Sequence, residues 1–311
     1  MRYRALATLT FTVALGATTV LSASQASADA PRPDVSTATG RVVDPPVIVD
    51  DAAMAHIRAL QKISDESGGN RAHGRPGFKA SADYVKSTLD AAGFQTTLQP
   101  FTHAGAQGWN VVAEWPHGDA NNVMMIGAHL DSVPQGPGMN DNGSGTAAVL
   151  ENALTVAKSN LRPEKRMRFG FWGAEEVGLV GSKFYVQSLA AADKQKIKAY
   201  LNFDMAGTPN TKAWGIYQEG PDLSAGFKAF FSSKAVKTTT INPAGRSDHS
   251  SFSAAGVKVT GISSESNLSN LEPCYHAACD RAANVDPKVL GLGANAIATV
   301  FWKLAGAKTV S

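Results

Sequence analysis

Residues 123–130, VMMIGAHL, form a short apolar run that ends in His129 and leads directly to Asp131. A run of this length without alternating polar residues is typical of a strand that is buried on both faces. Such strands occur in parallel sheets covered by helices on both sides, and ligands bind at the carboxyl ends of these strands. We therefore place His129 at the binding edge of a parallel sheet.

Apolar runs of strand length alternate with helical patterns on either side of this stretch. Helices are expected over 50–67, 78–92, 145–158, 178–189, 223–234 and 287–304, and further strands over 94–101, 109–115, 167–172, 200–203, 214–218 and 257–262. This alternation predicts an α/β fold, a three-layer sandwich with a largely parallel central sheet.

The first residues have the composition of a secretory signal peptide. Arg2 and Arg4 precede an apolar stretch over 6–21, and the small residues 26–28 follow it. We expect cleavage after Ala28, so that 1–28 is a signal peptide, with a retained membrane anchor as the alternative. Residues 29–46 are rich in proline and polar residues, which predicts a flexible tail or short pro-segment before a single domain over 47–306.

The bulk charge gives no reason to expect nucleic acid or a membrane surface as a partner. Loss of Arg2 and Arg4 with the signal peptide lowers the 29 lysines and arginines to 27, against 26 acidic residues, and no basic block occurs. Partners of these kinds usually require a concentrated basic face.

The chain contains two cysteines, Cys274 and Cys279, which bracket Tyr275 and His276. In an exported protein a close pair is expected to form a disulfide, whereas two reduced thiols would fit a cytosolic protein. A disulfide here would hold His276 and Tyr275 in a small ring.

Acidic residues follow the predicted strands. Glu175 and Glu176 come after the predicted strand 167–172, and Asp204 comes directly after the predicted strand 200–203. Asp141 lies in the turn before the helix that begins at residue 145. Each has an ordinary alternative, as an acid that complements a helix dipole or as an Asx turn. Three strand ends that each supply a ligand favour a shared site.

These side chains suit a catalytic zinc site, because His, Asp and Glu bind zinc while open positions remain for water and substrate. There are enough ligands for two metal ions that share one carboxylate, with a glutamate left over to transfer protons. Asp131 is the nearest carboxylate able to orient the His129 ring, and Tyr275 could donate a hydrogen bond to an oxyanion.

Five ordered motifs resemble the M28 family of zinc aminopeptidases, especially its secreted bacterial members. They are HLDS at 129–132, NDNGSG at 140–145, AEEVGL at 174–179, NFDM at 202–205 and CYHAAC at 274–279. The resemblance extends from about residue 46 to residue 304, and it implies a mixed eight-stranded sheet between helices.

The resemblance also implies a role for each position. One zinc ion would be bound by His129 and Asp204, the other by Glu176 and His276, and Asp141 would bridge the two ions. Glu175 would act as the general base and then as the general acid, and Tyr275 would donate a hydrogen bond to the scissile carbonyl oxygen. Asp131 would be the partner of His129, and Arg246 would form part of the pocket for the substrate amine.

The implied function is that of a secreted, monomeric aminopeptidase that removes a large apolar N-terminal residue from peptides. The alternatives are a zinc carboxypeptidase or deacylase on the same fold, and a binding protein without catalysis. The last is disfavoured because all five metal ligands are present.

The chain departs from its family in two places. The connection Ile262–Pro273 is shorter than its counterpart in close relatives, so we expect the pocket wall to differ there. Calcium ligands of a relative correspond to Val47, Gly291 and Asn295, which carry no carboxylate. We therefore expect no calcium requirement.

Overall fold

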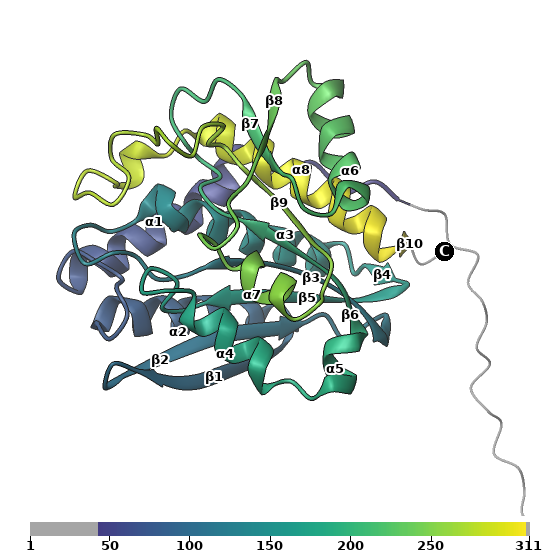
Figure 1. The fold of residues 1–311 in the computed structure, drawn as a ribbon, viewed down its shortest axis with the longest axis horizontal. Coiled ribbons are helices and arrows are strands. Elements are labelled where there is room, and N and C mark those ends of the chain that lie inside the picture. Colours follow the sequence, from purple (N-terminus) through teal and green to yellow (C-terminus); the bar gives the residue numbers. More distant parts are fainter. Residues whose placement is uncertain (1–42, 309–311) are drawn as a thin grey trace, which may run out of the picture. The chain divides into compact units, whose positions relative to one another are not determined.

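The computed structural model describes residues 43–308, which form one mixed eight-stranded sheet between helices (Figure 1). The strand order is β1-β2-β5-β3-β6-β9-β7-β8. Neighbours are parallel from β5 through β3 and β6 to β9 and between β7 and β8, and the remaining pairs are antiparallel. The strands are β1 (Gln95–His103), β2 (Ala106–Glu114), β3 (Asp119–His129), β5 (Lys165–Trp172), β6 (Ile197–Phe203), β7 (Trp214–Tyr217), β8 (Thr238–Ile241) and β9 (Val259–Ser263).

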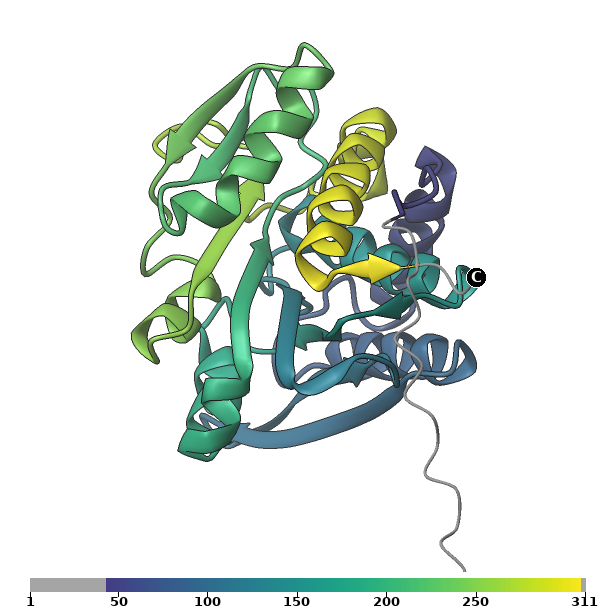
Figure 2. The same ribbon diagram turned by 90° about the vertical axis from the view of Figure 1, so that its right-hand side faces the viewer.

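Helices cover both faces of the sheet, which confirms the predicted three-layer α/β fold. Figure 2 shows α8, in yellow, and α1, in purple, on one side of the sheet. The first layer comprises α1 (Asp50–Glu66), α2 (Pro76–Ala91), α3 (Gly145–Lys158), α6 (Pro221–Ser233) and α8 (Pro287–Ala305). The second comprises α4 (Val180–Ser188), α5 (Ala191–Lys196) and α7 (His249–Ala254).

The central strand β3 is buried on both faces, as its continuous apolar sequence predicts. Met124 and Ile126 belong to the larger core beneath α1, α3 and α8. Val123 and Met125 belong to a smaller core that includes Phe252 of α7. Because helices exclude water from both faces of β3, its polar last residue, His129, lies at the carboxyl edge of the sheet.

Some short elements lie outside the predicted set. β8 has the sequence TTTI with three exposed threonines, so it lacks the apolar signal of a strand. The six-residue helices α5 and α7 and the two-residue ladder of β4 (Arg162–Pro163) with β10 (Ala307–Lys308) are too short for a clear periodicity. They add to the edges of the fold and leave its class unchanged.

The predicted signal peptide 1–28 and most of the tail 29–46 lie outside the described residues, and the domain boundaries 47–306 stay a prediction. Within residues 43–308, no helix combines the length and the apolar character needed to cross a bilayer.

Candidate metal centre

Three neighbouring strands bring the candidate ligands together. His129 is the last residue of β3, and it is paired in register with Trp172, the last residue of β5. Asp204 directly follows β6, which lies on the other side of β3. Parallel strands end at the same edge of a sheet, so these polar residues meet there although up to 75 residues of sequence separate them.

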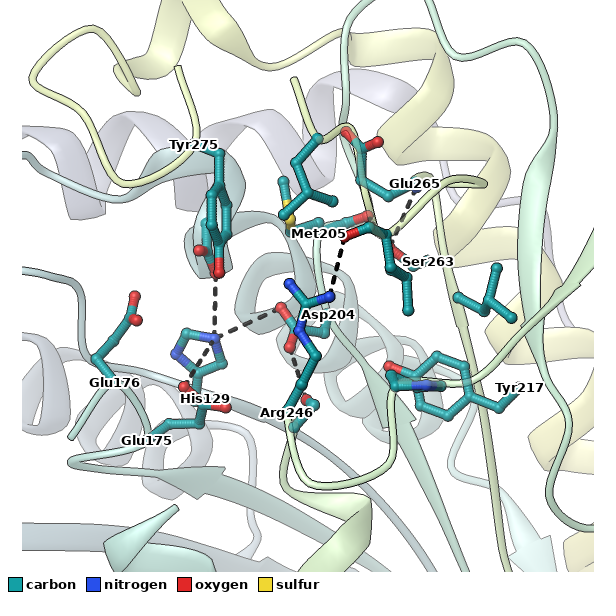
Figure 3. A pocket seen from close by; sticks show the side chains of 16 residues that line it. His129, Glu175, Glu176, Asp204, Met205, Tyr217, Arg246, Ser263, Glu265 and Tyr275 are labelled. Carbon is teal, nitrogen blue, oxygen red and sulfur yellow. Dashed lines mark hydrogen bonds and ion pairs between the residues drawn. The ribbon is translucent and has the colours of Figure 1, made fainter. Parts of the chain in front are cut away.

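His129 lies at the centre of one group of carboxylates (Figure 3). Its Nε2 atom is 3.3 Å from Oδ1 of Asp141, 3.5 Å from Oδ1 of Asp204 and 4.0 Å from Oε2 of Glu175. The His129 side chain is buried, and so are those of Asp141 and Glu175. This group can offer a metal ion one nitrogen and several oxygen atoms.

A second group forms around His276. Its Nε2 atom is 3.1 Å from Oδ2 of Asp141 and 3.0 Å from Oε2 of Glu176. Asp141 therefore presents one carboxylate oxygen to each histidine and lies between the two groups.

The distances fit zinc. Two ligand atoms that bind one tetrahedral zinc ion at about 2.0–2.1 Å lie roughly 3.3 Å apart. The four contacts of Asp141, Asp204 and Glu176 with the histidines range from 3.0 to 3.5 Å. In addition, Oδ1 of Asp204 and Oε1 of Glu176 are buried without a hydrogen-bond partner. Buried carboxylate oxygens without hydrogen-bond donors are groups that a bound cation would stabilise.

Asp141 lies in η1 (Met139–Ser144), a turn whose residues are all buried and in which the Asp141–Asn142 peptide bond is cis. The carboxylate of Asp280 accepts the backbone N–H of Asn140 at 2.8 Å and that of Asp141 at 2.9 Å. The side-chain oxygen of Asn142 accepts the N–H of Gly145 at 2.8 Å. These bonds hold the turn so that the Asp141 side chain faces both histidines.

Asp131 organises the site mainly through backbone contacts. Nδ1 of His129 is 3.2 Å from the main-chain oxygen of Asp131 and 3.7 Å from its carboxylate. The carboxylate oxygens instead accept the N–H groups of Glu175, at 3.0 Å, and Glu176, at 3.4 Å. Asp131 thus links the end of β3 to the turn that carries both glutamates.

Cys274 and Cys279 form the predicted disulfide. Within the ring that it closes, the aromatic ring of Tyr275 stacks on that of His276, with centroids 3.8 Å apart and planes 18° apart. The ring closed by the disulfide and this stacking together orient Tyr275 beside the carboxylate cluster, where it lines the cleft.

The cleft beside the cluster has a mixed wall. Its polar part includes Ser247, whose hydroxyl donates to Oδ2 of Asp204 at 2.6 Å, and Arg246, which is exposed and donates to the main-chain oxygen of Leu268 at 3.0 Å. The connection Ile262–Pro273 contributes to the lining. The other lining residues are Met205, Tyr217, Ile241, Pro243, Ser263, Glu265 and Leu271.

The cluster carries more negative charge than its own cations can balance. Burial, reinforced by the Asp141 carboxylate, raises the pKa of Glu176 to about 7. Burial also raises the pKa of Glu175 well above its usual range. For His276, contacts with Asp141 and Glu176 outweigh burial and raise the pKa to about 10. A divalent cation would relieve this excess, because it is the largest local charge that such a site can hold.

Arg71 and Asp280 support the site and were not predicted from the sequence. Arg71 is fully buried, and its guanidinium donates to the main-chain oxygens of Leu130, Pro137 and Gly138. Both residues act on the backbone of the ligand-bearing segments, so no ligand spacing reveals them. The polar stretch 70–75 and the acid after Cys279 are the only sequence signals.

Residues 110–301 match a family model described as Peptidase family M28. The chain belongs to this family. Leupeptin-inactivating enzyme 1 of Streptomyces exfoliatus is 47% identical over 276 residues, which cover 84% of this chain and 63% of that protein. An aminopeptidase of Pseudomonas aeruginosa is 42% identical over 219 residues, which cover 62% of this chain and 40% of that protein. The chain therefore spans about 40–63% of the length of these relatives.

Solved structures share the fold at low sequence identity. A zinc aminopeptidase from Bacillus subtilis superposes with a TM-score of 0.75 at 17% identity, over 84% of this chain and 96% of that one. A glutaminyl cyclase from Bacteroides thetaiotaomicron gives 0.70 at 18% identity, over 83% and 99%. The same fold thus occurs in proteins named for different reactions, so the fold alone does not specify the activity.

Proposed function

We propose that this protein is a binuclear zinc aminopeptidase. His129 and Asp204 would bind one zinc ion, Glu176 and His276 the other, and Asp141 would bridge them. The observation that carries the proposal is the position of Asp141, which has one carboxylate oxygen 3.3 Å from His129 and the other 3.1 Å from His276. The name of the Pseudomonas aeruginosa relative, an aminopeptidase, supports the same activity.

Zinc ions bound there would supply Lewis acidity, which polarises a peptide carbonyl and lowers the pKa of a water molecule. Glu175 is the residue we assign to proton transfer. Its carboxylate is buried beside the cluster, 4.0 Å from His129 Nε2, and its backbone is held by Asp131. Glu175 accepts a proton from the attacking water and returns it to the leaving amine nitrogen. Burial raises the pKa of this carboxyl, which favours a group that both accepts and donates a proton.

Tyr275 is the proposed hydrogen-bond donor to the scissile carbonyl oxygen. Burial raises the pKa of its hydroxyl, so the group keeps its proton over the physiological range. Its stacking on His276 orients the ring before substrate arrives. A donor held in place in this way stabilises developing negative charge at little reorganisation cost.

The acid-rich site favours a substrate with a free, cationic N-terminus over one with a terminal carboxylate. Apolar side chains in the cleft, among them Met205, Ile241 and Leu271, support a preference for large apolar N-terminal residues. Peptides are the expected substrates. We further propose that the protein is secreted, on the composition of residues 1–28, and that it acts as a monomer.

Hydrolysis of leucyl anilide tests the activity, with the N-acetylated analogue as its comparison. We expect the free amine to be cleaved and the blocked one to resist. Preferred cleavage of the blocked compound, or of a peptide from its C-terminus, would support a deacylase or carboxypeptidase instead. Elemental analysis should give two zinc ions per chain, and chelation should abolish turnover.

A further inference from the structure

Glu265 is an acidic residue in the cleft that the proposed reaction does not use. It lies two residues beyond the end of β9, and its N–H donates to the hydroxyl of Ser263 at 3.2 Å (Figure 3). Its side chain lines the cleft yet is only 7% exposed. It is separate from the metal cluster, since neither group of candidate ligands includes it.

The Glu265 carboxylate lacks a cationic partner. Its Oε1 atom is buried without a hydrogen-bond partner, and no lysine, arginine or histidine among residues 43–308 forms an ion pair with it. Burial raises its pKa, and the nearby Glu272 carboxylate adds to the rise, although the Thr208 hydroxyl and the Glu272 N–H favour the ionised form. Burying a carboxylate is costly unless it is paired, so a cationic ligand would stabilise this group.

The walls near Glu265 suit an aliphatic chain. Leu268 and Leu271 come from the same connection, and Ile241 and Pro243 from the segment at the end of β8. Arg246, the one arginine that lines the cleft, directs its guanidinium to the main-chain oxygen of Leu268 and not to Glu265. An acid without a cationic partner between apolar walls is suited to bind a long aliphatic side chain that ends in a positive charge.

We propose that Glu265 is a specificity-determining residue that pairs with the side-chain cation of a basic N-terminal residue, lysine or arginine. The cleft then accepts two kinds of side chain. Large apolar ones contact the leucines and Ile241, and basic ones make the same contacts and also neutralise Glu265. This inference rests on the proposed aminopeptidase function, because it assumes that the N-terminal side chain occupies this cleft.

Lysine and norleucine make the matched comparison, because norleucine has the same four-carbon side chain without the ammonium group. The ratio of kcat/KM for the lysyl and norleucyl anilides is measured in the wild-type zinc protein and in Glu265→Gln, which keeps the shape and removes the charge. We expect the ratio to fall about 10-fold or more, the usual size of a lost charged hydrogen bond. Glu66→Gln, at an exposed position of α1, should leave the ratio unchanged.

Binding of lysinamide and norleucinamide, measured by calorimetry on the same proteins, gives a readout independent of turnover. Weaker binding of lysinamide to Glu265→Gln, with norleucinamide binding much less affected, supports the inference. This holds even if the wild-type protein cleaves no anilide, a result that would overturn the proposed aminopeptidase function and not the role of Glu265. An unchanged ratio, or an equal loss for both ligands, overturns the role of Glu265. If Glu265→Gln does not fold, Glu265→Met provides the comparison.

Discussion

The carboxylate of Asp280 accepts the backbone N–H of Asp141 at 2.9 Å, across 139 residues of sequence. Asp280 directly follows Cys279, so the disulfide segment that carries His276 is tied to the turn that carries the proposed bridging carboxylate. The two segments that form the second metal group therefore support each other's positions.

Asp280→Asn should weaken the site without touching a ligand. An asparagine side chain has one acceptor oxygen, so it cannot receive the N–H groups of both Asn140 and Asp141. We expect the free energy of unfolding to fall by about 1–3 kcal/mol and the affinity for zinc to fall as well. Chemical denaturation and competition with a chelator measure the two effects. Asp65→Asn, at an exposed ion pair with Arg281, is the control and should change stability by less than about 1 kcal/mol.

Glu175→Ala and His129→Ala should separate proton transfer from metal binding. The first variant should keep both zinc ions and lose about 10²–10⁴-fold in kcat, since general acid–base catalysis contributes that much. The second should lose zinc, because the Nε2 atom of His129 is the only nitrogen in its group. Zinc content and turnover are measured on the same samples. Near-normal turnover of Glu175→Ala would contradict the proton-transfer role.

Arg71→Lys should destabilise the protein although it conserves the charge. A lysine cannot bond the main-chain oxygens of Leu130, Pro137 and Gly138 at once. Each buried acceptor left unpaired costs about 1–3 kcal/mol, so we expect a loss of at least about 2 kcal/mol. Urea denaturation of the zinc-free protein measures it, and Arg58→Lys, on an exposed part of α1, should be near neutral. Equal stability of both variants would contradict the bracing role.

Removal of the disulfide in a Cys274→Ser, Cys279→Ser double variant should affect one metal group more than the other. Opening so short a ring costs about 2 kcal/mol by the chain-entropy model. It also frees His276 and Tyr275, while His129 remains fixed at the end of β3. Limited chelation should then remove one zinc ion per chain earlier than in the wild type. Simultaneous loss of both ions, as in the wild type, would argue against this separation.

Calcium should not activate the protein. Near the start of α1, the Asn295 side chain donates to the main-chain oxygens of Ile48, at 2.8 Å, and Gly291, at 2.7 Å, and accepts the N–H of Ile48 at 3.0 Å. These hydrogen bonds already satisfy the Asn295 amide and the backbone of Ile48. Among residues 43–308, the groups of three metal-ligating side chains lie at the cleft and not here. A clear rate gain when calcium is added to chelated, zinc-restored protein would contradict this.

Much of the fold was predictable because its main elements are long and strongly patterned. The helix Gly145–Lys158 has the predicted limits, as apolar periodicity marks buried elements most clearly. Strands β5 and β6 end at the predicted residues, Trp172 and Phe203, but begin two and three residues earlier than predicted. The edge strand β8 and helix α7 were not predicted, because exposed threonines and a six-residue helix carry little periodic signal.

The sequence by itself determined which residues could bind metal and that His129, Glu175, Glu176 and Asp204 would share one edge of a parallel sheet. Those conclusions need only local patterns and the rule that parallel strands end together. The tertiary structure decided how Asp141 divides its oxygens between two histidines and that Glu265 lies in the cleft without a cationic partner. Such facts depend on contacts between segments up to 139 residues apart, through Asp280 and the connection that bears Glu265, and no local pattern encodes them.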